Sequence, residues 1–211
     1  PPENQPDDLS SEAGTDVPTS VSSASVNSPS NTDDAAADPA ASDTTDTSSD
    51  ETSTKGLKAS AQLIITGGTF SLDTADDALH SNGDISISGG TYTIATGDDG
   101  IHADNAVTIT DCDPTIADSY EGIEGLSIDI SGGTISVKAS DDGLNAAGGA
   151  DSSGFGGRGG DAFAVTDGAC ITISGGTLTV DADGDGLDSN GDLRITGGVT
   201  YVAGPTSGAD S

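Results

Sequence analysis

The sequence predicts an all-β protein, a right-handed parallel β-helix, on the basis of two observations. First, a strand motif with a Gly-Gly pair and an acidic turn recur together about every 22 residues. Second, 31 glycines, no tryptophan and only 3% aromatic residues leave little large apolar material for a conventional globular core. Repeats this short must stack on one another, because no single repeat can bury its own apolar face. A solenoid with thin apolar layers is therefore expected.

Each repeat contains two strands that meet at the Gly-Gly pair. In residues 84–94, four apolar side chains alternate with serine and threonine and are expected to point inward: Ile85, Ile87, Tyr92 and Ile94. The Gly-Gly pairs fit the corners between strands, where a positive φ or a close backbone approach excludes a side chain. The motif Ile-Ser-Gly-Gly-Thr and its variants occupy residues 65–69, 87–91, 130–134, 173–177 and 195–199.

A third, short strand is expected after each acidic turn. It begins with an apolar residue that would extend the core, at Leu79, Ile101, Ile123, Leu144 and Leu187. Three strands per repeat make one coil, and six coils are predicted, starting near Leu63, Ile85, Val107, Ile128, Ile171 and Leu193. The third coil departs from the repeat at Asp111–Pro114. Because proline has no N–H to donate, the ladder there should be irregular.

Two regions of different composition divide the chain. Residues 1–58 consist mainly of Ser, Thr, Asp, Pro and Ala, and we expect a disordered linker because they cannot bury enough apolar surface to offset ordering. Such a tract can hold a secreted domain away from a cell surface, or act as a spacer with no further role. Residues 59–211 carry the repeats, and the last coil stops where its acidic turn is due. We therefore expect the β-helix to be truncated at its C-terminus.

The charge balance narrows the possible partners. With 36 Asp and Glu against 5 Lys and Arg, the formal net charge is −31, which excludes a nucleic-acid binder and disfavours an anionic membrane surface. No run of apolar residues is long enough to span a membrane. The two cysteines, Cys112 and Cys170, lie two coils apart, or ~9.6 Å at the spacing of stacked strands. That exceeds the reach of a disulfide, so two free thiols are expected.

The acidic turns predict a file of carboxylates along the solenoid. Equivalent residues of neighbouring coils lie ~4.8 Å apart, so their charges repel unless a cation neutralises them. Calcium takes oxygen ligands at ~2.3–2.6 Å and could bridge two coils. The sequence therefore predicts Ca²⁺, with a solvated acidic edge as the alternative. The predicted ligands are Asp76, Asp77, Asp98, Asp99, Glu121, Asp141, Asp142, Asp183, Asp185 and Asp188.

Two further patterns lie within the acidic turns. Residues 181–192 resemble an EF-hand loop, but they have Asp188 where an apolar residue is required and they need flanking helices, so a cation site within the solenoid is the better interpretation. His80 and His102 share one position of the repeat, which Glu124 and Asn145 occupy in later coils. Stacked histidines could bind a transition metal, but a ladder of polar side chains is the favoured interpretation.

A glycine-rich insertion interrupts the repeat between residues 145 and 170. It contains Phe155, Arg158 and Phe163, which we predict to bind carbohydrate. An aromatic ring can stack on a sugar, and a guanidinium can hold a uronate carboxylate with two hydrogen bonds. The alternative is a glycine loop whose phenylalanines only cover the coil below.

The chain resembles a known family in its joint motifs. These are Gly-Asp-Asp-Gly-Ile-His-Ala-Asp at 97–104, the repeated Ile-Ser-Gly-Gly-Thr strands, the loop at 154–163 and the acidic run at 181–192. In this combination residues 59–211 resemble a bacterial carbohydrate-binding β-helix family, once a domain of unknown function, which is related in fold to pectate lyases. The resemblance implies a secreted or cell-surface domain that binds calcium and plant-type polysaccharide, such as cellulose or polygalacturonate, without established catalysis.

Three functions therefore compete. The first is a non-catalytic, calcium-stabilised polysaccharide-binding domain. The second is an enzyme on the same scaffold, but a lyase needs a basic residue beside calcium, and Lys138, Arg158 and Arg194 all lie outside the acidic turns. A hydrolase needs only paired carboxylates, so catalysis stays open. The third is structural, either an adhesin stalk or an ice-binding face of Thr-x-Thr rows, which Asp113 and Val199 interrupt.

Overall fold

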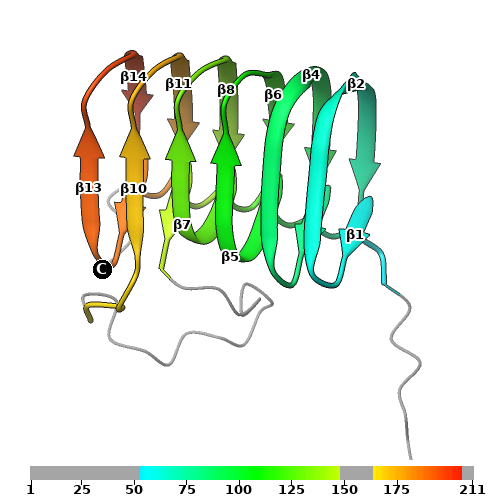
Figure 1. Cartoon of the computed structure of the whole chain (residues 1–211), viewed down its shortest axis with the longest axis horizontal. Helices are drawn as coiled ribbons and strands as arrows, with labels where there is room; N and C mark the ends of the chain where they lie inside the picture. Colours follow the sequence, from blue (N-terminus) through cyan, green and yellow to red (C-terminus); the bar gives the residue numbers. More distant parts are fainter. Residues whose placement is uncertain (1–52, 148–163, 206–211) are drawn as a thin grey trace, which may run out of the picture. The chain divides into compact units, whose positions relative to one another are not determined.

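The computed structural model describes residues 53–147 and 164–205, which form a parallel β-helix (Figure 1). These residues belong to the second of two units of the chain, Pro1–Ser48 and Ser49–Ser211. In Figure 1 the nearer strands run upward, the more distant strands run downward, and successive coils advance toward the left, which makes the helix right-handed as expected. Within the described ranges every regular element is a strand, and no helix there could cross a membrane.

Three faces of parallel strands build the coils. The first face contains the short strands, with residues Leu57, Leu79, Ile101, Ile123, Leu144 and Leu187 in register along it. Its strands are β1 (Leu57–Ala59), β3 (Leu79–Ser81), the beginnings of β5 (Ile101–Ile109) and β7 (Ile123–Ile130), β9 (Leu144–Ala146) and β12 (Leu187–Ser189). β1 begins inside the predicted linker, residues 1–58, with Leu57 and Lys58.

The other two faces meet at the Gly-Gly corners. The second face consists of the first halves of β2 (Gln62–Thr74) and β4 (Asp84–Thr96), the ends of β5 and β7, then β10 (Cys170–Ile173) and β13 (Asp192–Ile195). The third face consists of the second halves of β2 and β4, then β6 (Asp113–Asp118), β8 (Thr134–Ala139), β11 (Thr177–Ala182) and β14 (Val199–Ala203).

The core is the column of apolar layers that the period-two pattern predicts. Ile85, Ile87, Tyr92 and Ile94 are all buried, and each stacks on its equivalent in the next coil. Where the layers begin, Phe70 stacks on Tyr92 with ring centroids 4.8 Å apart. Burial of apolar area at ~25 cal/mol per Å² is the main term that stabilises such layers.

The corners confirm the role expected for glycine. The second glycine of each pair has a positive φ, as at Gly133, where φ is 91°. A Cβ on Gly133 would also lie 2.3 Å from the carbonyl oxygen of Cys112 in the preceding coil. Both the backbone conformation and the space therefore require a residue without a side chain.

The third coil is irregular, but its register shift lies after the position that the sequence predicts, because Pro114 itself pairs in register with Tyr92. Ile94 pairs with Ile116, but the next residue, Ala95, pairs with Asp118, so one residue is left over in β6. The pairing of β6 with β8 is reduced to Thr115 with Ser136 and Ile116 with Val137. A β-bulge therefore disturbs the third face just before the third acidic turn.

Both cysteines are free, as expected, and they differ in exposure. Cys112 is buried, and this burial, followed by the charges of Asp113 and Asp111, raises the pKa of its thiol to about 12. Cys170 is only half-buried. Because the thiolate is the reactive form, we expect one thiol to react with Ellman's reagent in the native protein and both to react in guanidinium. The Cys170→Ser variant should remove the native reaction; rapid native labelling of that variant would contradict the burial of Cys112.

Candidate functional site

The acidic turns join the third face to the first, and their backbones stack in register. The amide of Ala78 donates to the carbonyl of Asp99 at 3.0 Å, and Gly100 donates to Glu121 at 3.0 Å. The same bonds follow between Gly122 and Asp142 and between Gly143 and Asp185, at 3.0 and 2.9 Å. The backbone ladder therefore continues through the turns, so the turn residues form the continuous column predicted from the repeat.

The second carboxylate of each acidic pair has a structural role that the sequence analysis missed. Oδ1 of Asp77 accepts a hydrogen bond from the amide of Asp99 at 3.2 Å, and Oδ1 of Asp99 accepts one from Glu121 at 3.1 Å. Asp142 does the same for the amide of Asp185 at 2.7 Å. Each of these side chains thus holds the equivalent residue of the next coil. A carboxylate that accepts an amide N–H forms a strong, charge-assisted hydrogen bond.

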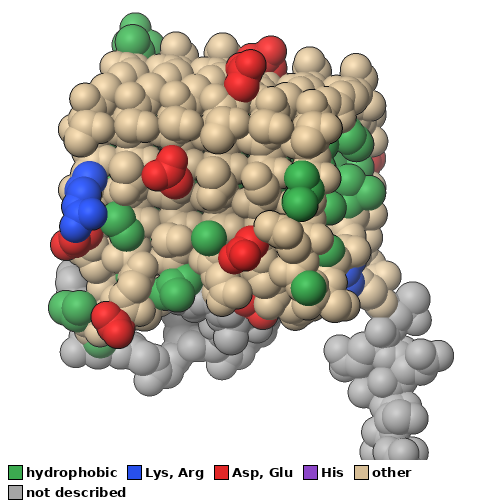
Figure 2. Space-filling model, in the orientation of Figure 1, with side chains coloured by type: hydrophobic (Ala, Val, Ile, Leu, Met, Phe, Trp, Pro, Cys, Tyr) green, Lys and Arg blue, Asp and Glu red, His purple; other side chains and the backbone are tan. Residues whose placement is uncertain are grey.

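The column passes from buried to exposed along the solenoid. Asp77, Asp99 and Glu121 are buried, and Asp142 is half-buried. Among the remaining predicted ligands, those half-buried are Asp76, Asp98, Asp141 and Asp188, and those exposed are Asp183 and Asp185. Figure 2 shows only scattered acidic side chains on the face that bears β5, β7, β10 and β13.

A lysine neutralises the first turn. Lys55 precedes Asp77 by one repeat, and its Nζ lies 2.9 Å from Asp76 Oδ1 and 2.6 Å from Asp77 Oδ2. The Lys55 side chain is 8% exposed and that of Asp77 is fully buried. Burial raises the pKa of Asp76, but hydrogen bonds from Lys55 and from the Asp77 amide lower it by more, so the net shift is downward. Lys55 lies in the range whose composition predicts a linker, so the repeat pattern did not reveal this cation.

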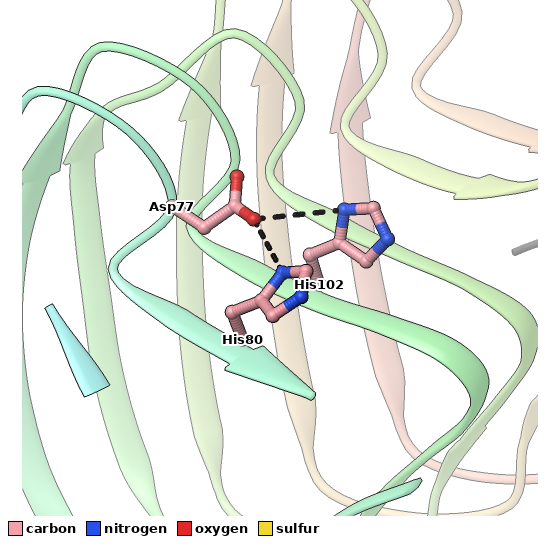
Figure 3. A group of neighbouring side chains, drawn as sticks. All are labelled: Asp77, His80 and His102. Carbon is pink, nitrogen blue, oxygen red and sulfur yellow. Dashed lines mark hydrogen bonds and ion pairs between the residues drawn. The ribbon is translucent and has the colours of Figure 1, made fainter. Parts of the chain in front are cut away.

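The two histidines lie inside the column, in register with each other as expected. Nδ1 of His80 is 2.7 Å from Asp77 Oδ2, and Nδ1 of His102 is 3.8 Å from the same oxygen (Figure 3). The ring centroids are 5.0 Å apart and the planes are inclined by 49°. Both side chains are buried. The first two coils therefore place Lys55 and two imidazoles among their carboxylates.

His102 also faces the carboxylates of its own coil and of the next. Its Nδ1 lies 3.2 Å from Asp99 Oδ2 and 3.0 Å from Glu124 Oε2. Burial alone would lower the pKa of His102, but these contacts raise it well above its usual value. Burial, together with Glu124, raises the pKa of Asp99 despite the His102 hydrogen bond. Burial and then the charges of Glu124 and Asp99 raise the pKa of Glu121 in the same way.

In the fourth and fifth coils the same turn positions hold carboxylates but no lysine or histidine. At the positions of Lys55 and His80, the fourth and fifth coils have Asp142 with Asn145, and Asp185 with Asp188. Burial raises the pKa of Asp142 to about 7, although the Asp185 amide lowers it, and the charges of the neighbouring aspartates add to the rise. This half of the column therefore holds more negative charge than the first half.

One other surface could bind a polymer, and it lies on the third face. On the third face an outward row of side chains runs across all six coils: Ser71, Thr93, Thr115, Ser136, Thr179 and Tyr201. Thr115 keeps this row continuous through the third coil, where only the neighbouring row is interrupted by Asp113. Beside the C-terminal end of the insertion lies a hollow of about 320 Å³, lined by residues 165–170, Gly191, Asp192 and Arg194. Phe155, Arg158 and Phe163 lie outside the described residues.

The fold and the site define an acidic parallel β-helix whose turn column is rich in carboxylates. A family model described as carbohydrate-binding domain-containing protein matches residues 12–100. The matched segment includes the first two acidic turns, with Asp76, Asp77, Asp98 and Asp99. Neither the search of curated proteins nor that of solved structures gives a match.

Proposed function

We propose that this chain is a non-catalytic carbohydrate-binding domain of a secreted or surface protein, and that calcium stabilises its β-helix. The family match over residues 12–100 is the observation that carries the proposal. Polysaccharides of the plant cell-wall type, cellulose or polygalacturonate, are the ligands to test first. A β-helix suits this role because its long flat faces repeat at ~4.8 Å, which lets one polymer chain contact several coils.

Calcium is best accommodated in the second half of the column. Asp141, Asp142, Asp185 and Asp188 offer only oxygen donors, which is the donor set that calcium prefers. Next to them, the buried Oδ1 of Asn145 has no hydrogen-bond partner within the described residues. A hard cation would satisfy such an amide oxygen and neutralise the repelling carboxylates. When bound, the ion supplies positive charge, while the side chains hold it and join one coil to the next.

Catalysis is less well supported than binding. A lyase of this kind needs an unprotonated basic group beside the sugar. Lys55, the cation nearest to the turn carboxylates, is engaged with Asp76 and Asp77, and it is largely buried. A side chain held by ion pairs to two carboxylates is not free to act as a base on a sugar.

Calorimetric titration of polygalacturonate and of cello-oligosaccharides into the calcium-loaded chain tests the proposal. We expect saturable binding of one of them, no ultraviolet-absorbing unsaturated product, and weaker binding after chelation. Chelation should also lower the unfolding temperature, since an ion at about 100 times its Kd stabilises the folded state by about 2.7 kcal/mol. Formation of unsaturated product would instead identify an enzyme, and failure of both glycans to bind would favour a structural stalk.

The chain's two arginines provide a matched pair for the same titration. Arg158→Gln is expected to weaken polygalacturonate binding, because the guanidinium is proposed to hold a uronate carboxylate. Arg194→Gln should have little effect, because Arg194 already pairs with Asp192 on the exposed surface of β13. Equal losses in both variants would point to general charge attraction and contradict a specific role for Arg158.

A further inference from the structure

Asp99, His102 and Glu124 form a separate cluster in the middle of the column. Asp99 lies in the second acidic turn, and His102 follows it at the beginning of β5. Glu124 is the register partner of His102 on β7, in the next coil. The exposed fractions of the three residues are 0%, 0% and 6%. The cluster is therefore inside the protein and joins two coils.

The distances within this cluster suit a small metal ion. His102 Nδ1 lies 3.2 Å from Asp99 Oδ2 and 3.0 Å from Glu124 Oε2, and the ligand atoms of all three residues lie within 4.8 Å of one another. In a tetrahedral zinc site with bonds of ~2.0–2.2 Å, neighbouring donor atoms are roughly 3.3 Å apart. Both distances from Nδ1 are within a few tenths of an ångström of that spacing.

The surroundings of the imidazole also suit a metal ion at Nδ1. The other ring nitrogen, Nε2, lies 3.5 Å from Asp104 Oδ1. Both of these atoms are buried, and neither has a hydrogen-bond partner within the described residues. Carboxylate oxygens therefore lie on both sides of the ring. A metal ion on Nδ1 would leave Nε2–H to donate to Asp104, and metal-bound histidines characteristically donate their second N–H to a carboxylate.

The local charge also favours a divalent ion beside His102 rather than beside His80. Asp77, beside His80, already pairs with Lys55. Besides Asp77, whose Oδ2 lies 3.8 Å from His102 Nδ1, the buried carboxyl groups near His102 are those of Asp99, Glu121 and Glu124. Glu121 Oε2 has no hydrogen-bond partner within the described residues.

We propose that Asp99, His102 and Glu124 bind one divalent metal ion of the zinc class, with Asp104 as the hydrogen-bond acceptor of the metal-bound histidine. The nitrogen donor separates this site from the all-oxygen calcium positions, because imidazole suits zinc and related transition metals and calcium takes oxygen ligands. The ion ties the second coil to the third from within. This inference concerns a different ion and a different part of the column from the proposed function, and its test does not depend on sugar binding.

Metal analysis and cobalt spectroscopy of the purified chain test the site. Protein produced in zinc-supplemented medium and dialysed against chelator should retain about one zinc per chain, because a buried closed site exchanges slowly. Protein produced with Co²⁺ should show the visible d–d bands of a nitrogen-containing site. The His102→Gln variant should lose both signals, whereas the matched His80→Gln variant should keep them. Asp104→Asn should weaken zinc binding about tenfold or more.

Circular dichroism of each variant separates loss of the site from loss of the fold. Folded His102→Gln protein without metal, beside metal-loaded His80→Gln, supports the assignment. Wild-type protein that holds no zinc or cobalt, with ¹⁵N shifts showing protons on both nitrogens of His102, would overturn it in favour of a buried imidazolium. Equal metal content in both histidine variants would overturn it as well.

Discussion

Replacing Lys55 with methionine is expected to lower the free energy of unfolding by about 3–5 kcal/mol, the cost of removing one partner of a buried ion pair. The variant leaves Asp77, which is fully buried, without the ammonium 2.6 Å from its Oδ2. Methionine keeps most of the length of the side chain, so the loss reports charge more than packing. Urea denaturation followed by circular dichroism measures the effect.

The neighbouring lysine provides the control for this experiment. Lys58 is exposed and lies on β1, in register with His80. Lys58→Met should change stability by less than about 0.5 kcal/mol, as is usual for surface substitutions. Adding Asp77→Asn to Lys55→Met should recover part of the loss, because the amide keeps an oxygen for the Asp99 N–H and carries no charge. If the two lysine variants are equally stable, Lys55 does not neutralise the first turn.

Replacing Gly122 with alanine is expected to destabilise the β-helix by about 1–3 kcal/mol through overpacking. A Cβ at Gly122 would lie 2.2 Å from Cγ1 of Val137 and 2.3 Å from the carbonyl oxygen of Gly143 in the next coil. One obstacle is backbone, which cannot move without breaking the ladder of the acidic turns. Thermal unfolding of the purified variant gives the size of the effect.

The first coil supplies a natural reference for this substitution. Ala78 occupies the position that is glycine in every later coil: Gly100, Gly122, Gly143 and Gly186. Ala78→Gly should cost no more than about 1 kcal/mol, the price of the added backbone freedom. A Gly122→Ala protein as stable as the wild type would mean that the coils can separate at the turn without loss. That outcome would contradict close approach as the reason for the repeated glycine.

The fold could be predicted from the sequence because a repeat turns local patterns into a stack. Once the spacing of the apolar residues was known, the position of Ile101 fixed that of Ile123, and the structure has them in register. The acidic file followed from the same reasoning, since equivalent residues of neighbouring coils must lie close together. The hydrogen bonds that the Asp77, Asp99 and Asp142 side chains accept depend on the path of the turn backbone, which no side-chain pattern reveals.

Other parts of the site could not be predicted for different reasons. Lys55 was overlooked because its surroundings have a linker composition, although Leu57 stands one repeat before Leu79 and could have indicated an additional coil. The grouping of Asp99, His102 and Glu124 combines residues of two coils with Asp104, and it required distances. The roles of Phe155, Arg158 and Phe163 stay predictions.

The charged side chains of the turn column are distributed unevenly between its two ends. Two positions of the turn, those of Asp77 and His80, recur in every layer. They hold Lys55 and Lys58 in the first layer and Asp185 and Asp188 in the last, and the histidines lie between these ends. These ends are separated by several layers of ~4.8 Å, well beyond the Debye length of ~8 Å at physiological salt. Each end therefore presents its own potential to an approaching ion or polymer. The first layers, where Lys55 offsets two carboxylates, would repel an anionic glycan less than the last layers do, until cations bind there. Ion concentration would then decide how many layers such a polymer can contact.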